Sequence, residues 1–239
     1  MLFGAAFTVV WRSLKDAWED AFQLALNNVI WLLAVAIGPT AYLGASQFIP
    51  NPVILGATIV MTALLLPLAT VGMFCVTNRS AHGKAVHVSD LFDGAKRFWW
   101  RSWVWFLATA AVLFLVIWSL LFYTNLVSGY FKFLVGGFWL AVGLVWTLMQ
   151  IYFWPLMIEQ DKPNILRAWR NSFVLVVREP LFVLVLLACF IAITAISIIF
   201  AVAFMIAYMA IISLAANNAT LALLVKSGVI ELPRKQLRL

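Results

Sequence analysis

The chain has 239 residues, of which 65% are hydrophobic and 10% are charged. A soluble globular domain carries about 25% charged residues, so a water-soluble fold of this length could not bury so much apolar surface. The net charge of +7 would suggest nucleic-acid binding in a soluble protein. Here the positive residues flank apolar runs, so we expect no nucleic-acid partner and a single all-α integral membrane domain over residues 1–239.

Uncharged runs long enough to cross the hydrocarbon core, which takes about 20 helical residues, recur along the chain. They cover residues 21–47, 53–77, 103–124, 133–158 and 180–225. The last run has room for two helices, 180–200 and 202–225, joined by a turn near Phe200. The alternative is one long, tilted helix and five crossings in total.

The positive charges favour six crossings over five. With six, fifteen of the sixteen Lys and Arg residues fall on one side of the membrane, and Lys132 is the exception. Lys and Arg concentrate in cytoplasmic loops, so the pattern places both termini and the tail 226–239 in the cytoplasm. Five crossings would place the four positive residues of that tail outside.

Three segments on the predicted cytoplasmic side have the pattern of amphipathic helices: 1–20, 89–101 and 163–178. Aromatic and aliphatic side chains share one side of each helix, and we expect each helix to lie in the membrane interface. Their basic residues should attract anionic lipids, at about 1 kcal/mol for each Lys or Arg near the surface. The candidate interfacial or docking residues are Trp18, Arg97, Trp99, Trp100, Arg101, Arg167, Trp169 and Arg170.

These segments also resemble one another. Residues 17–22 (AWEDAF) and 168–173 (AWRNSF) share their spacing, and 94–99 (GAKRFW) fits more loosely. Each amphipathic segment precedes two apolar runs. One explanation is a threefold internal repeat of an interfacial helix plus a transmembrane hairpin. The other is that short aromatic amphipathic helices look alike.

The predicted spans contain no Asp, Glu, Lys, Arg or His, apart from Lys132 at a boundary. Ionisable residues inside a membrane mark proton relays and ion pathways, so their absence argues against a proton-coupled pump. His82 and His87 have no acidic or cysteine partner at ligand spacing, which favours solvated loop histidines over a metal pair. The sequence therefore predicts no cofactor, no metal site and no catalytic residue.

Neutral polar residues do occur within the spans. Gln150 lies in the fourth span, and Asn217 and Asn218 lie in the sixth. They are candidate contacts for a polar solute. The alternative is interhelical hydrogen bonding, which contributes about 0.6–2 kcal/mol for each bond.

Several short motifs resemble a known family. Residues 28–33 (NVIWLL), 67–74 (PLATVGMF) and 152–156 (YFWPL) resemble motifs of the YesL-like bacterial integral membrane proteins. The resemblance covers most of residues 25–225, although this chain has extra residues between Gly38 and Pro67. It implies a small helical protein of the bacterial cytoplasmic membrane whose relatives are often linked with carbohydrate uptake systems, and it implies no catalytic residues.

These observations favour a non-enzymatic accessory or scaffolding subunit of a larger membrane complex, with the lipid bilayer and other membrane protein subunits as partners. The alternative is a component of a membrane transport system, such as one for carbohydrates, that uses Gln150, Asn217 and Asn218 as polar contacts. A lipid-modifying enzyme is the least favoured class, because the spans offer no acid, base or nucleophile for it.

Overall fold

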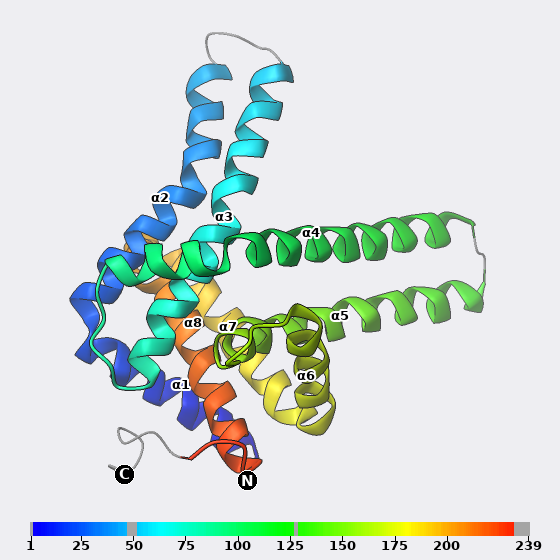
Figure 1. Ribbon diagram of the computed structural model, residues 1–239. Helices are drawn as coiled ribbons and strands as arrows, with labels where there is room; N and C mark the ends of the chain where they lie inside the picture. Colours follow the sequence, from blue (N-terminus) through cyan, green and yellow to red (C-terminus); the bar gives the residue numbers. More distant parts are fainter. Residues whose placement is uncertain (1, 47–51, 127–128, 232–239) are drawn as a thin grey trace.

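The computed structural model describes residues 2–46, 52–126 and 129–231, and in these residues it contains helices but no strand. Eight helices follow one another in the described residues (Figure 1). They are α1 (Leu2–Glu19), α2 (Ala21–Ser46), α3 (Pro52–Ala81), α4 (Ser89–Leu126), α5 (Tyr130–Ile158), α6 (Ile165–Arg178), α7 (Pro180–Ile199) and α8 (Ala201–Lys226).

Six of these helices are long and apolar enough to cross a membrane. Their candidate spans are Ala21–Gly44, Ile54–Ala81, Ser89–Tyr123, Tyr130–Ile158, Pro180–Ile199 and Met205–Lys226. An apolar helix satisfies its own backbone hydrogen bonds, which makes it one of the few structures that lipid tolerates. The chain is therefore an all-α polytopic membrane protein, as its composition predicts.

The spanning helices form three hairpins: α2–α3, α4–α5 and α7–α8. In Figure 1 the first hairpin projects upward from the body of the molecule and the second projects sideways. The inner ends of the hairpins are packed and the outer ends are not. In α2, for example, Leu24 and Trp31 are buried near the start of the helix, whereas Leu43 near its end is 63% exposed.

Helix α8 lies at the centre of the packed region, where it contacts α1, α2, α3, α5 and α7. Small residues on this helix are fully or almost fully buried, namely Ala215, Ala216 and Ala219. Helices in lipid approach closely where their side chains are small, because dispersion contacts then act over a large area. The alanines therefore explain how one helix can pack against so many others.

Two helices are longer than the predicted segments. The interfacial segment 89–101 is no separate helix, because α4 runs without interruption from Ser89 to Leu126. From Gly94 onward α4 contains no proline that would end the helix. The Ser102 hydroxyl donates a hydrogen bond to the Trp99 carbonyl of the same helix at 2.7 Å. Helix α3 continues to Ala81 and so includes Arg79 in its last turn.

Other bounds lie close to the predicted ones. Phe200 separates α7 from α8. Helices α1 and α6 occupy the segments predicted to be interfacial at 1–20 and 163–178. Of the predicted tail 226–239, residues 232–239 lie outside the described residues.

The motifs that suggested a repeat do not occupy equivalent places. Trp18 lies at the end of α1 and is 83% exposed. Trp169 lies early in α6 and packs inward, with its ring 5.7 Å from that of Trp146 and 5.4 Å from that of Phe153. An amphipathic helix does precede a hairpin in both α1–α3 and α6–α8. The threefold repeat stays a prediction at the level of helix order.

Candidate functional site

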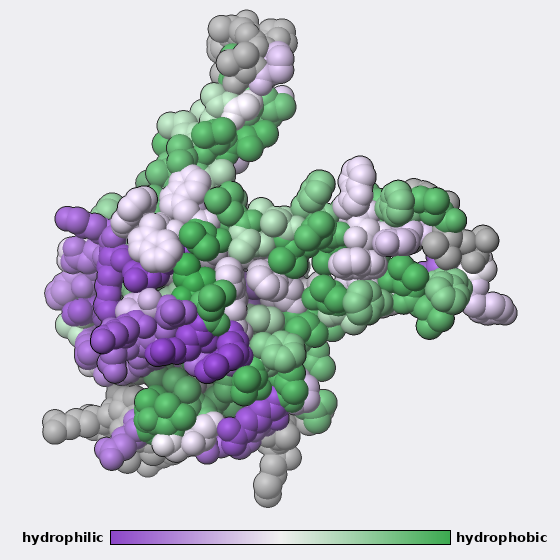
Figure 2. Space-filling view, turned by 45° about the vertical axis from the view of Figure 1, so that its right-hand side comes forward, coloured by the Kyte–Doolittle hydropathy of each residue, from purple (hydrophilic) through white to green (hydrophobic). Residues whose placement is uncertain are grey.

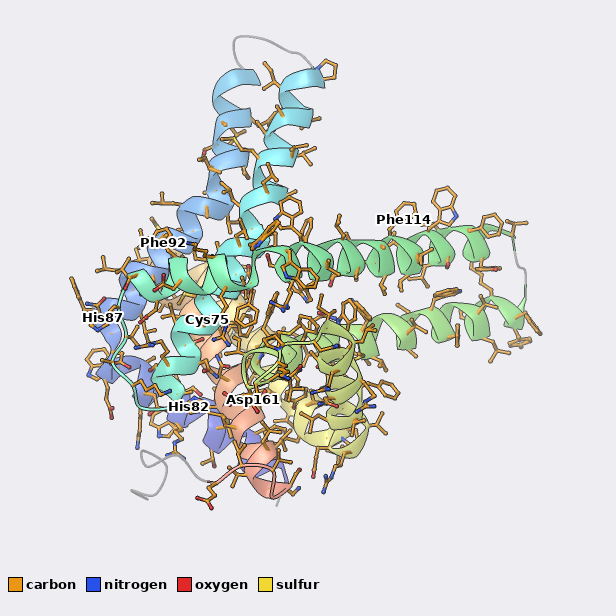
Figure 3. The ribbon with its side chains drawn as sticks, viewed as in Figure 1. Cys75, His82, His87, Phe92, Phe114 and Asp161 are labelled. Carbon is orange, nitrogen blue, oxygen red and sulfur yellow. The ribbon has the colours of Figure 1, made fainter. Side chains whose placement is uncertain are left out.

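A polar cavity of about 550 Å³ opens where α3 ends, α4 begins and α5 ends. Figure 2 shows hydrophilic residues gathered at this end of the molecule, away from the tips of the two projecting hairpins. Cys75, His82 and Asp161, labelled in Figure 3, lie around the cavity. Its polar and charged lining comprises Asn78, Arg79, His82, Lys84, Asp90, Asp93, Arg97, Glu159, Gln160 and Asp161.

The wall between α3 and α4 is formed by a tight reversal of the chain. Gly83 follows the end of α3 with a φ angle of 68°, a conformation that glycine adopts without steric cost. The Asp90 carboxylate accepts a hydrogen bond from the His87 N–H at 2.8 Å, as the carboxylate of a capping box does. The reversal returns the chain so that the start of α4 faces the last turns of α3.

An ion pair joins these two helices across the cavity rim. The Arg79 Nε atom lies 3.1 Å from the Asp90 Oδ2 atom. The same guanidinium donates to the Ala85 carbonyl, with distances of 3.3 Å from Nε and 3.2 Å from Nη2. Arg79 therefore holds both the intervening loop and the beginning of α4.

A second set of contacts joins α3 to the end of α5. The Asn78 Nδ2 atom donates to the Glu159 Oε1 atom at 2.6 Å, and the His82 Nε2 atom lies 3.5 Å from the same oxygen. The other His82 ring nitrogen, Nδ1, lies 2.9 Å from the Asn78 carbonyl oxygen. Glu159 is thus fixed by Asn78 of α3 and by His82, which directly follows this helix.

Close backbone packing lies behind the cavity. A Cβ atom added at Gly94 would lie 2.6 Å from the Cys75 Cβ atom and 2.8 Å from its Sγ atom. A Cβ atom added at Gly72 would lie 2.5 Å from the Leu91 carbonyl oxygen. The two glycines allow α3 and α4 to touch, and this contact sets the distance between the cavity walls.

The polar residues predicted inside the membrane bond to three different helices. Gln150 accepts from the Trp105 Nε1 atom of α4 at 2.7 Å. Asn217 donates to the Thr77 hydroxyl of α3 at 3.0 Å, and Asn218 donates to the Ser13 hydroxyl of α1 at 3.0 Å. Their geometry is that of interhelical hydrogen bonds.

The candidate docking residues divide into two groups. Trp18, Trp99 and Trp100 are exposed aromatic residues, and Arg167 and Arg170 are exposed on α6.

The others have defined neighbours. Arg97 lines the polar cavity, with its guanidinium carbon 5.1 Å from the centre of the Phe98 ring. The guanidinium carbon of Arg101 lies 4.8 Å from the centre of the Trp100 ring. Trp169 packs inward against α5 and does not extend the exposed aromatic surface.

The sequence did not identify the polar cavity. The sequence favours a solvated loop residue at His82, whereas His82 lines the cavity together with Asp90 and Asp93. The available signal was that residues 78–97 and 159–161 carry charges of both signs on the same predicted side of the membrane. Among the described residues, no group of three or more His, Cys, Asp or Glu side chains is arranged to hold a metal ion.

No protein-family model, curated protein or solved structure matches this chain. The YesL-like resemblance therefore stays a prediction, and the function is argued from the geometry.

Proposed function

We propose that this protein is a non-enzymatic accessory or scaffolding subunit of a larger complex in the bacterial cytoplasmic membrane. The observation that supports this most is the outer part of the α4–α5 hairpin, which extends away from the packed body (Figure 1). In the described part of 104–141 the buried residues are Val116 and Ser119. Large apolar side chains are exposed there instead, among them Phe114 at 62%, Trp118 at 60% and Phe133 at 76%.

One face of this hairpin is shaped for contact with another helix. Gly137 and Ala141 lie four residues apart on α5, so they share a face, and both are exposed. A Cβ atom added at Gly137 would meet no atom of the described residues within 4 Å. Small residues at this spacing let a second transmembrane helix approach closely in lipid. We place a transmembrane helix of a partner subunit on this face.

Helix α1 suits anchoring at the membrane surface. Its exposed aromatic residues include Phe7 at 67% and Trp11 at 59%, besides Trp18. The Lys15 Nζ atom lies 5.9 Å from the centre of the Trp11 ring. Aromatic rings with basic neighbours are favoured at the headgroup level, where anionic lipids also attract the positive charge.

The test is to replace Gly137 with leucine and to compare what co-purifies after gentle detergent extraction. We expect the wild-type chain to migrate with a partner subunit identified by mass spectrometry, and Gly137→Leu to lose that partner because the added side chain blocks close approach. Gly56→Leu is the matched control, since a Cβ atom at Gly56 of α3 also meets no atom within 4 Å. A wild-type chain that migrates as a lone monomer would contradict the proposal.

The transport alternative requires Gln150, Asn217 and Asn218 to line one path. Their hydrogen bonds go to three separate helices, so no specific observation favours this alternative.

A further inference from the structure

We propose that the polar cavity binds a small zwitterion that carries a phosphate and an ammonium group, of the phosphoethanolamine type. This inference does not rest on the accessory-subunit proposal. It follows from how the charges of the cavity are distributed between paired and unpaired groups.

Internal contacts fix the cavity walls. Arg79 is paired with Asp90 at 3.1 Å, and Glu159 is held by Asn78 and His82. These groups tie α3 to α4 and α3 to α5. These groups are already paired with one another, so they form a frame that holds the walls in place, and other groups of the cavity would contact a ligand.

Other side chains of both charge signs line the cavity without forming an ion pair in the described part of the chain. Lys84, Arg97, Asp93 and Asp161 line the cavity, and none of them has an ion pair within 4.0 Å in the described part of the chain. Arginine and lysine bind phosphate through charge-assisted hydrogen bonds, and carboxylates accept the same kind of bond from ammonium groups. The free groups therefore match a ligand with both charges.

Basic and acidic groups are nearly balanced in the cavity. Three basic side chains of Lys or Arg type and four carboxylates line the cavity. A site for a polyanion such as a nucleotide would carry an excess of basic groups, which this cavity lacks. A compact zwitterion offers one group of each sign, and the unpaired side chains, two basic and two acidic, can contact both.

The cavity wall also carries a hydrogen-bond donor without a partner among the described residues. The Gln160 Nε2 atom is buried and has no hydrogen-bond partner among the described residues, whereas its Oε1 atom accepts from the Asn164 N–H at 2.8 Å. A buried donor without a partner is uncommon in native structures and indicates a place for water or a ligand. The cavity volume of about 550 Å³ lies within the range of small-molecule sites.

The test uses the full chain in detergent and isothermal titration with phosphoethanolamine, inorganic phosphate and ethanolamine. The last two probes carry one charged group each. We expect phosphoethanolamine to bind at least tenfold more tightly than either of them. Arg97→Gln should weaken the binding of phosphoethanolamine tenfold or more and abolish the binding of phosphate. Asp161→Asn should weaken the binding of phosphoethanolamine tenfold or more and abolish the binding of ethanolamine.

Arg170→Gln is the control, because Arg170 is exposed on α6 and does not line the cavity. It should leave all three titrations unchanged. The melting temperature of each variant shows whether it is folded, and the exposure of Arg97 and Asp161 makes unfolding unexpected. The proposal is overturned if phosphate alone binds as tightly as phosphoethanolamine, if no probe binds, or if Arg97→Gln and Arg170→Gln behave alike.

A second arm identifies the source of the ligand. In nanodiscs of phosphatidylcholine the soluble probe should bind, which supports the site. If adding phosphatidylethanolamine to the nanodiscs suppresses that binding, the site takes a lipid headgroup; if binding is unchanged, it takes a soluble molecule. Loss of the partner in the Gly137→Leu experiment would leave these titrations unaffected, so the two proposals fail separately.

Discussion

At the scale of single residues, Asn28 makes the most specific contact between distant parts of the chain. It is fully buried on α2. Its Nδ2 atom donates to the Met205 carbonyl of α8 at 2.7 Å, and its Oδ1 atom accepts from the Met209 N–H at 2.8 Å. Met205 and Met209 are the two ends of one helical turn, so a single amide bonds both groups that a regular helix pairs with each other.

Replacing Asn28 with leucine keeps the volume and removes both bonds. Because leaving buried polar groups unsatisfied costs about 1–3 kcal/mol, we expect a lower melting temperature in detergent. Asn27→Leu is the matched control. Asn27 is equally buried, but in the part of the chain that the structure describes its amide nitrogen bonds to the Gln23 carbonyl within α2 alone, and its Oδ1 atom has no partner there. Equal losses in the two variants would show that the contact between α2 and α8 adds no stability.

At the scale of helices, the contact of α3 with α4 sets the position of the polar cavity. Gly72→Ala would bring a Cβ atom to 2.5 Å from the Leu91 carbonyl oxygen, which is backbone and cannot rotate away. We expect the two helices to separate, at a cost of about 1–3 kcal/mol. Thermal unfolding in detergent measures this cost.

The control for that prediction is Gly56→Ala on the same helix, where the added atom meets nothing within 4 Å. Alanine favours helix over glycine by up to about 1 kcal/mol, so this variant should be neutral or more stable. A Gly72→Ala protein as stable as the Gly56→Ala protein would mean that α3 and α4 do not approach as closely as described.

The helices themselves were largely predictable, because the length of each apolar run indicates the length of its helix and the apolar composition indicates a lipid environment. The turn between α7 and α8 at Phe200 followed from the length of one run. The unbroken α4 did not follow from the sequence. The change from an amphipathic to an apolar pattern near Ser102 indicates a change of environment and not the end of a helix. A helix can pass through that change without ending.

At the scale of the whole molecule, the polar cavity could not be predicted, since it depends on which helix ends meet. Asn78 and Glu159 are 81 positions apart and come together only through the packing of α3 against α5. The same holds for Gln150, Asn217 and Asn218. The sequence offered hydrogen bonding as one explanation of these residues, and only the fold could supply their partners.

From the positions of Lys and Arg we predict that the polar cavity and the tip of the α4–α5 hairpin lie on opposite sides of the membrane. Cysteine labelling with a membrane-impermeant maleimide tests it most directly, in a background with Cys75→Ala and Cys189→Ala. Lys84→Cys and Lys162→Cys report the cavity side, and Tyr130→Cys, where the native side chain is 91% exposed, reports the tip of α4–α5. We predict that Tyr130→Cys is labelled in spheroplasts and the other two only in inside-out vesicles. Labelling of Tyr130→Cys and Lys84→Cys from the same side would contradict the account.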